Sequence, residues 1–427
     1  MDTKERLALI SQVGEEIVTK DDLVKILDKK QNPIAYDGFE PSGKNIHIAQ
    51  GLLRAININK MTKAGCRFKI LIADWHAWAN NKMNGNLEHI QKVGEYLIEV
   101  WRACDMDLKN VEFVWASDLV KDNNYWKEVM QIARISTVKR IQRCSQIMGR
   151  KEGDAQQASQ ILYPCMQAAD IFYLGADICQ LGMDQRKVNV LAREVSKKLG
   201  HAEPVIVSHH MLSGLQGPLP KIEGIETLSD KIPLGKDMQK ILKDTGILIS
   251  QHYPSLLGVF RAIETDLETA KTGSMDKINQ AVKSIKELKE KYFEERQIGL
   301  KMSKSKPDTA IFMNDNLESI EKKLRKAYCP EGIVDDNPVL EYCNYIIFER
   351  FKKFKVERSE KWGGPIEFSS YIELKDAFKK KEVHPMDLKA SVVKHLHMLL
   401  VPVQDRLSKN KKAKQLEKEI EPFIVTS

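Results

Sequence analysis

A strand–turn–helix–strand pattern in the first hundred residues constrains the fold more than any other feature of the sequence. Residues 33–38 are typical of a short strand that enters a Gly/Pro/Ser turn at 40–44. Apolar residues then recur at helical spacing over 48–56, and 68–73 form an apolar run typical of a buried strand. Such a βαβ unit is the building element of a parallel, doubly wound sheet. We therefore predict an α/β fold.

A second set of elements of the same kind lies downstream. Residues 177–182 and 205–207 are predicted strands, and 186–199 between them is a predicted helix. The stretch between the two halves, about 112–163, is predicted to be mostly helical. Together these elements predict a Rossmann-like parallel-sheet domain at 1–216 that carries a helical insertion.

Composition limits the class of protein. With 427 residues, the chain is expected to form more than one domain. Its seven cysteines include no CxxC pair, so we expect neither a zinc site nor a disulfide framework, and the count fits a reducing cytoplasm. The sequence contains no run of eighteen apolar residues, so we expect no membrane span. The net charge of +8 suits a nucleic-acid partner, but a lysine-rich surface explains it equally well.

Two local motifs point to phosphate chemistry. Lys301 and Lys304 lie three residues apart in a KMSKS loop, where both could counter the charge that moves onto a departing pyrophosphate. The turn at 43–50 lies at the start of a predicted helix, where free N–H groups favour phosphate, and it contains His47. Taken singly, these motifs are also consistent with a lysine-rich surface loop and an incidental histidine.

In combination, the two motifs resemble the signatures of the class I aminoacyl-tRNA synthetases. The HIGH signature of that family reads HIAQ here, with Gln50 in place of the last histidine. Residues 36–43, 163–170 and 182–187 look like the first strand, the tyrosine-binding helix and the ribose loop of archaeal and eukaryotic tyrosyl-tRNA synthetases. Residues 361–364 and 384–389 look like parts of their anticodon-binding domain.

One predicted helix face fits an amino-acid pocket. Tyr163, Gln167 and Asp170 follow i, i+4, i+7 spacing, so they share a face. The resemblance implies that Tyr163, Gln167 and Gln185 hold the α-amino end of tyrosine, and that Tyr36 and Asp170 hold its phenol hydroxyl. The competing interpretation is an amphipathic helix whose polar groups face solvent.

The resemblance also implies the reaction and its other residues. Tyrosine would react with ATP to give tyrosyl-adenylate, and tRNA(Tyr) would then accept the tyrosyl group. Mg²⁺ is expected to arrive with ATP, without a metal bound by the protein. The implied catalytic residues are His47, Lys301 and Lys304. The implied ATP-binding residues are Gly43, His47, Gln50, Gly182, Asp184, Lys301, Ser303 and Lys304. The implied tRNA-binding residues are Arg143, Arg186, Trp362, His384 and Asp387.

The second half of the chain is expected to divide into three parts. Residues 217–298 are a mostly helical insertion that is atypical of the family, 299–325 contain the KMSKS loop and a linker, and 326–427 form a helical anticodon-binding domain with a basic tail. The insertion is interpreted as a surface decoration in preference to a tRNA contact or a restraint on the KMSKS loop. The family implies a homodimer, formed across the helical stretch between the sheet halves. No membrane partner is expected, because the sequence lacks a long apolar run.

Three other functions compete with this interpretation. A tryptophanyl-tRNA synthetase shares the fold and the signatures, but Tyr36 and Asp170 suit a phenolic hydroxyl, which indole lacks. A non-catalytic RNA-binding relative would not need intact Lys301 and Lys304. A small-molecule nucleotidylyltransferase would not need the anticodon-type domain.

Overall fold

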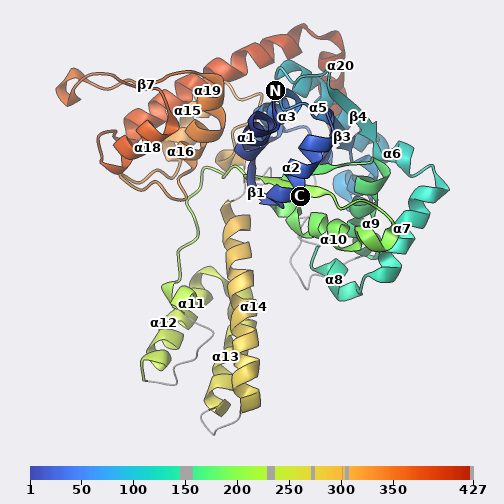
Figure 1. Cartoon of the computed structure of the whole chain (residues 1–427). Helices are drawn as coiled ribbons and strands as arrows, with labels where there is room; N and C mark the ends of the chain where they lie inside the picture. The colour runs from blue at the N-terminus through green and yellow to red at the C-terminus, as the bar shows by residue number, and fades with distance from the viewer. Residues whose placement is uncertain (145–156, 228–235, 271–274, 301, 303–306, 424–427) are drawn as a thin grey trace.

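The chain folds around a six-stranded, mostly parallel sheet (Figure 1). Strand β1 is antiparallel to β6, and the other pairings are parallel, in the order β1-β6-β5-β2-β3-β4. The strands are β1 (Gly14–Val18), β2 (Ile34–Phe39), β3 (Arg67–Ile72), β4 (Val111–Trp115), β5 (Ile178–Gly182) and β6 (Val205–His209). The computed structural model describes residues 1–144, 157–227, 236–270, 275–300, 302 and 307–423.

The pairing of β2 with β3 confirms the predicted βαβ unit. The two strands run parallel in one uninterrupted register. Between them the chain makes a π-helical turn, η1 (Ala49–Leu53), followed by helix α3 (Arg54–Lys63). Strands β5 and β6 repeat the arrangement on the other side of β2, with α10 (Arg186–Ser196) between them. The predicted α/β class with a Rossmann-like parallel sheet is therefore confirmed.

The predicted helical stretch at about 112–163 is wrong at its start. Residues 112–115 belong to strand β4, which pairs with β3 from Val111 to Trp115. Four of the five residues of β4 are β-branched or aromatic, and such residues favour a strand. The helices that follow are α6 (Ala116–Leu119), α7 (Asn123–Ile135), α8 (Val138–Gln142) and α9 (Ala158–Tyr173).

Helices cover both faces of the sheet, with an apolar cluster on each face. Successive side chains of a strand point to opposite faces. In β3, Ile70 and Ile72 accordingly join the cluster of α1, α3 and α5, whereas Leu71 joins the cluster of α7, α9 and α10. Burial on both faces holds the strand ends in fixed positions. The helices introduced here are α1 (Thr3–Val13), α2 (Lys20–Lys29), α4 (Asp74–Ala79) and α5 (Leu87–Ala103).

The described helices of residues 217–298 form an arm that projects from the sheet (Figure 1). The arm has an apolar cluster of its own, in which Phe260, Ile285 and Tyr292 are buried. Its packing therefore does not depend on the sheet. Its helices are α11 (Glu223–Thr227), α12 (Lys236–His252), α13 (Leu257–Ala270) and α14 (Met275–Leu300).

Both ends of the arm meet at its base. The backbone N–H of Gly214 donates to the carbonyl of Leu300 at 2.7 Å, which joins the entry and the exit of the arm. Arg296 Nη2 lies 2.9 Å from Asp336 Oδ2 and ties α14 to the C-terminal region. The chain therefore leaves the arm next to the point where it enters, and the arm lies in the sequence between the last strand of the sheet, β6, and the C-terminal region.

The C-terminal region is helical, as predicted, but it also contains a two-stranded antiparallel sheet that was not predicted. Each strand has only three residues, too few to give a recognisable periodicity. The elements are α15 (Leu317–Lys326), α16 (Pro338–Tyr342), β7 (Phe354–Val356), β8 (Ile366–Phe368), α18 (Tyr371–Lys379), α19 (Pro385–Lys409) and α20 (Lys411–Ile420).

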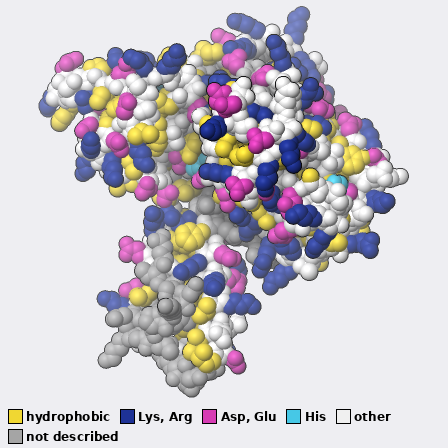
Figure 2. Space-filling model, viewed as in Figure 1, with side chains coloured by type: hydrophobic (Ala, Val, Ile, Leu, Met, Phe, Trp, Pro, Cys, Tyr) yellow, Lys and Arg dark blue, Asp and Glu magenta, His cyan; other side chains and the backbone are white. Residues whose placement is uncertain are grey.

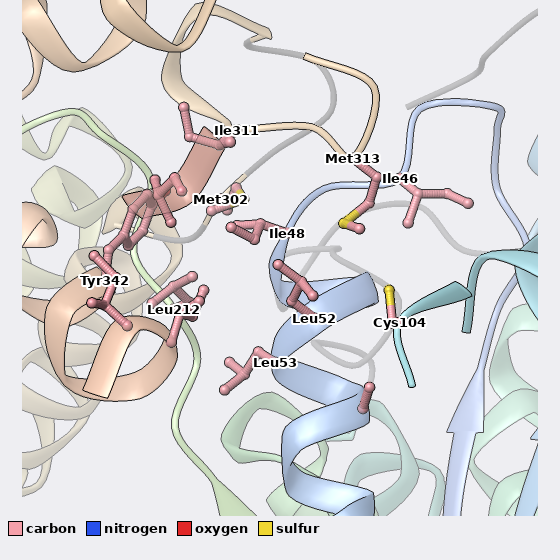
Figure 3. Packing of buried hydrophobic residues seen from close by; sticks show 14 of the residues in the cluster. Ile46, Ile48, Leu52, Leu53, Cys104, Leu212, Met302, Ile311, Met313 and Tyr342 are labelled. Carbon is pink, nitrogen blue, oxygen red and sulfur yellow. The ribbon is translucent and has the colours of Figure 1, made fainter. Parts of the chain in front are cut away.

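The C-terminal region shares an apolar cluster with the sheet domain. Ile48, just before the η1 turn, and Leu52, within it, belong to the same buried cluster as Met302, Ile311 and Tyr342 (Figure 3). The turn that carries the first signature motif is therefore packed against the chain that follows the second. Among the described helices, none is both long enough and apolar enough to cross a membrane.

Candidate active site

A polar pocket opens at the carboxyl edge of the sheet, where β2, β5 and β6 meet the η1 turn and α9. This edge is where open parallel sheets bind ligands. The structure brings together most of the predicted tyrosine- and ATP-binding residues in this pocket. Those that line it are Tyr36, His47, Gln50, Tyr163, Gln167, Asp170, Gly182, Asp184 and Gln185. The lining also includes Asp37, Arg54, His76 and His209, to which the sequence assigned no role.

The most deeply buried polar group of the pocket is Asp170, which has no exposed surface. The hydroxyl of Tyr125, on α7, donates to Asp170 Oδ1 at 2.8 Å. His76 Nε2, on α4, lies 2.9 Å from Asp170 Oδ2. A buried carboxylate without partners is costly, so these two contacts hold Asp170 in one orientation. Tyr125 and His76 were not predicted, because their helices are distant from α9 in the sequence.

The protonation of this cluster follows from its burial and charge. Burial is the largest influence on the pKa of His76 and lowers it, but the charge and contact of Asp170, together with the charges of Glu40 and Asp74, raise it above its ordinary value. Burial, with the charge of Asp170, raises the pKa of Tyr36 well above its usual value, so its phenol keeps its proton. Tyr163 packs edge-on against His76, with ring centroids 5.1 Å apart. The cluster thus offers hydrogen-bond donors and one carboxylate acceptor around a small space.

A pair of amides lies along the same helix face. Gln167 Nε2 donates to Gln185 Oε1 at 3.0 Å, which joins α9 to the short helix η4 (Met183–Gln185). Tyr163, Gln167 and Asp170 are all buried and all line the pocket. The alternative in which these polar groups face solvent is therefore wrong.

The ends of β5 and β2 shape another side of the pocket. A Cβ on Gly182 would come within 2.6 Å of Asp184 Oδ1 and 2.4 Å of Met211 Sδ, so this position admits only glycine without rearrangement.

Asp37 Oδ2, on β2, lies 2.9 Å from Arg54 Nη1. Burial raises the pKa of Asp37 to about 6, although Arg54 acts in the opposite direction. A carboxylate inside an otherwise apolar strand was the one sequence signal for Asp37.

Within the HIAQ motif, a side chain forms a hydrogen bond with the backbone of the same turn. Gln50 Oε1 accepts a long hydrogen bond, 3.4 Å, from the backbone N–H of His47. This contact explains how a glutamine fits at the position of the last histidine of the signature. Gly43, just before the motif, has a φ of 150°, but it is not among the residues that line the pocket.

The chain that follows the KMSKS loop runs beside this turn. The N–H of Ile48 donates to the carbonyl of Ile311, and the N–H of Met313 donates to the carbonyl of Ile46, both at 2.8 Å. Met302 is buried in the cluster shown in Figure 3. It is also one of the residues that line the pocket. The two signature motifs are thus adjacent in space. Lys301, Ser303 and Lys304, predicted to contact ATP, lie outside the described residues.

The residues predicted to bind tRNA lie apart from the pocket. Trp362 is 68% exposed at the tip of the β7–β8 hairpin, and His384 caps α19, in whose first turn Asp387 lies. Arg358 joins these two segments, because its guanidinium donates to the carbonyls of Gly364 at 2.5 Å and Glu382 at 2.7 Å.

The other two predicted tRNA contacts lie on the sheet domain. Arg143 is exposed after α8, whereas Arg186 forms an ion pair with Glu16 at 2.5 Å. On the face shown in Figure 2, acidic and basic side chains are interspersed, so the net positive charge is not gathered there into one patch. Charge alone therefore does not locate a nucleic-acid surface on this face.

No metal cluster is evident in the described part of the chain, where no three His, Cys, Asp or Glu side chains are placed to hold one ion. The acidic groups of the pocket have other neighbours, such as Arg54 beside Asp37 and His76 beside Asp170. The polar lining of the pocket suits a polar organic ligand.

Comparisons with known proteins identify the family of this chain. The sequence matches the family "tRNA synthetases class I (W and Y)" over residues 28–292 and 293–401. It is 42% identical to the cytoplasmic tyrosine–tRNA ligase 1 of Arabidopsis thaliana, over 100% of this chain and 90% of that protein. It is 37% identical to the tyrosine–tRNA ligase of Sulfurisphaera tokodaii, over 99% and 98%. The crystal structure of the tyrosyl-tRNA synthetase from Pyrococcus horikoshii complexed with L-tyrosine is similar at a TM-score of 0.76, with 33% identity over 98% of this chain and 100% of that one.

Proposed function

This chain belongs to the tyrosine–tRNA ligases of the class I tRNA synthetase family, and from that premise we propose how its pocket activates tyrosine with ATP for transfer to tRNA. The observation that carries the assignment of the pocket is the buried Asp170, held by Tyr125 and His76 next to Tyr36. A carboxylate fixed in this way can accept a hydrogen bond from a substrate hydroxyl.

The phenol of tyrosine binds beside Asp170 and Tyr36. Asp170 accepts the phenolic proton, and the protonated phenol of Tyr36 donates to the substrate oxygen. A donor and an acceptor together match a hydroxyl. The indole of tryptophan has no oxygen that could accept from Tyr36, and the ring of phenylalanine can form a hydrogen bond with neither Tyr36 nor Asp170. The site thus selects tyrosine by leaving its own buried polar groups unpaired when another amino acid enters.

The α-amino end of tyrosine binds beside Tyr163, Gln167 and Gln185. The amide pair lies along the helix face that also carries Asp170, so the ligand would extend along α9 with its carboxylate toward the η1 turn. The bond between Gln167 and Gln185 orients both amides before the ligand arrives, which reduces the entropy cost of binding.

Activation takes place where this carboxylate meets ATP. The carboxylate oxygen attacks the α-phosphorus, and the bond to pyrophosphate breaks. His47 and the positive, N-terminal end of the motif helix hold the phosphates, and Lys301 and Lys304 counter the charge on the departing pyrophosphate. Gly182 and Asp184 hold the ribose. No side chain serves as a nucleophile, so catalysis depends on position and charge.

The remaining ATP contacts are assigned to the loops around this site. Gly43 allows ATP to approach the backbone, and Gln50 and Ser303 complete the phosphate contacts. Mg²⁺ bound to the ATP phosphates would supply further positive charge. We assign no protein ligand to this cation, which is expected to travel with ATP.

The tRNA binds across the sheet domain (1–216) and the C-terminal domain (326–427). Trp362 stacks on an anticodon base, and Asp387 accepts a hydrogen bond from that base beside His384. The support for this assignment is that Arg358 joins the hairpin of Trp362 to the chain before α19. Arg143 and Arg186 meet the acceptor stem, for which Arg186 must exchange its contact with Glu16.

The assembly and the arm complete the proposal. The enzyme acts in the cytoplasm as a homodimer, formed across the helices between the two sheet halves. Residues 217–298 are a separate unit, and 299–325 link it to the C-terminal domain through the KMSKS loop. Because the arm has its own apolar cluster, we interpret it as a surface decoration that tyrosine activation does not require.

Direct isolation of the intermediate tests this function. The purified chain is mixed with tyrosine and ATP labelled at the α-phosphate, and protein-bound tyrosyl-adenylate is separated by gel filtration. We expect one equivalent or less of adenylate per chain, which disappears when tRNA is added and appears as tyrosyl-tRNA. An enzyme that binds ATP and tyrosine but forms no adenylate would contradict the proposal.

A further inference from the structure

His209 lies on the nucleotide side of the pocket and has no role in the mechanism above. It is the last residue of β6 and pairs directly across the sheet with Gly182. His209 Nε2 lies 3.5 Å from the point where a Cβ on Gly182 would be, and both residues line the pocket. The imidazole is therefore next to the backbone assigned to the ribose of ATP.

The hydrogen bonding of the ring fixes its tautomer. Gln180, which is almost completely buried in β5, places its Nε2 amide 2.6 Å from His209 Nδ1. With the amide nitrogen of Gln180 toward the ring, as it is placed here, Nδ1 accepts and carries no proton. Because a neutral imidazole has one N–H, that proton is on Nε2. The ring thus presents a donor on the edge that faces away from Gln180.

The surroundings keep this donor neutral. Burial lowers the pKa of His209 to about 3, and the charge of Arg54 acts in the same direction. The charge of His210 also lowers the pKa of His209. The charges of Asp184 and Glu15 raise this pKa, but by less than the other effects lower it. The imidazole consequently donates from the same atom over the whole physiological pH range and places no cation next to the ligand.

We propose that His209 donates its Nε2–H to the adenosine part of ATP and that Gln180 is the residue that positions it. Asp184 is an acceptor for ribose hydroxyls, so a neutral donor beside it complements the ribose oxygens and the ring nitrogens of adenine. The phosphates are assigned to the His47 turn, and the tyrosine phenol is assigned to Asp170. The inference rests on the proposed placement of the ribose at Gly182 and Asp184.

Kinetics of pyrophosphate exchange test this role. We expect His209→Ala to raise the KM for ATP about 3- to 10-fold, the range for loss of one neutral hydrogen bond. The Kd for tyrosine, titrated without ATP, should be unchanged. His209→Gln, which can place an amide N–H close to the same position, should bring the KM to within about 2-fold of the wild type. His209→Phe keeps the ring and serves if the alanine variant does not fold.

Controls separate this inference from the proposed function. His252→Ala, an exposed histidine at the end of α12, should leave both constants unchanged. An unchanged KM for ATP in both His209→Ala and His209→Phe would overturn the inference, as would an equal loss of affinity for tyrosine and ATP. If the wild-type chain itself showed no exchange, the proposed function would fail instead.

Discussion

Replacement of Asp170 by asparagine isolates the group to which we assign tyrosine recognition. The amide has the same shape, so the contact from Tyr125 at 2.8 Å can persist, and a neutral His76 can accept from the new amide N–H. What is lost is the charged acceptor for the substrate hydroxyl. A hydrogen bond to a charged group contributes about 1.5–3 kcal/mol, so kcat/KM for tyrosine should fall about 10- to 150-fold.

The same change should leave phenylalanine almost unaffected, because phenylalanine forms no hydrogen bond with Asp170. We expect its low kcat/KM to stay within about 3-fold, so the preference for tyrosine falls by nearly the factor lost for tyrosine. Pyrophosphate exchange at subsaturating amino acid measures both values, and a melting curve shows whether the variant is folded. Asp118→Asn, an exposed residue paired with Lys121, is a matched control.

Two results would refute this reasoning. One is a wild-type level of tyrosine exchange in Asp170→Asn, which would show that the carboxylate makes no contact with the substrate. The other is a fall of the same size for tyrosine and phenylalanine, which would assign Asp170 a structural role alone. Tyr125→Phe is a second test of the same cluster, because this variant leaves Asp170 Oδ1 without its hydrogen-bond donor. It should lower tyrosine exchange less than Asp170→Asn does.

Four further predictions concern other parts of the molecule. Lys304→Ala should lower the rate of adenylate formation on the order of 10²-fold and leave the Kd for tyrosine unchanged; rapid-quench kinetics that show no slowing would exclude Lys304 from the reaction. Asp387→Ala should lower tRNA charging by about 5-fold or more, from roughly 1–3 kcal/mol per base contact, and spare exchange without tRNA; an equal fall in both assays would make the residue structural. Burial opposes protonation of His210, but hydrogen bonds to Glu15 and Glu341 raise its pKa from 6.5 to about 9, so its stabilisation is complete below about pH 6.5 and is lost as the pH rises to 9; melting of His210→Gln should lose that dependence, and a retained slope would contradict it. Replacement of residues 217–298 by a short Gly/Ser linker should leave tyrosine exchange within about 3-fold, because Gly214 and Leu300 already meet at the base of the arm; loss of folding would show that the arm completes the core.

The sequence predicted those features that depend on local periodicity. The βαβ unit around β2 and β3 follows from apolar periodicity. Spacing also placed Tyr163, Gln167 and Asp170 on one face of α9, but only the resemblance implied that this face lines a pocket. Gln50 could be placed in the first turn of the motif helix, but its contact with the N–H of His47 could not.

Features that depend on tertiary contacts were missed. Tyr125 and His76 reach Asp170 from two other helices, and no spacing along the chain connects the three. Strand β4 was missed because its neighbouring helices dominated the pattern, although its composition favours a strand. The antiparallel pairing of β1 with β6 joins residues nearly two hundred positions apart, which periodicity does not encode.

Pyrophosphate exchange by the unmodified chain with different amino acids tests the central claim most directly. The chain is incubated with ATP, labelled pyrophosphate and, in parallel, tyrosine, tryptophan or phenylalanine at equal concentrations. A pocket built around Asp170 and Tyr36 predicts rapid exchange with tyrosine and at most traces with the other two, whose side chains leave buried polar groups unpaired. Exchange with tryptophan at a rate equal to or above that with tyrosine, or no exchange with any of the three, would contradict the account.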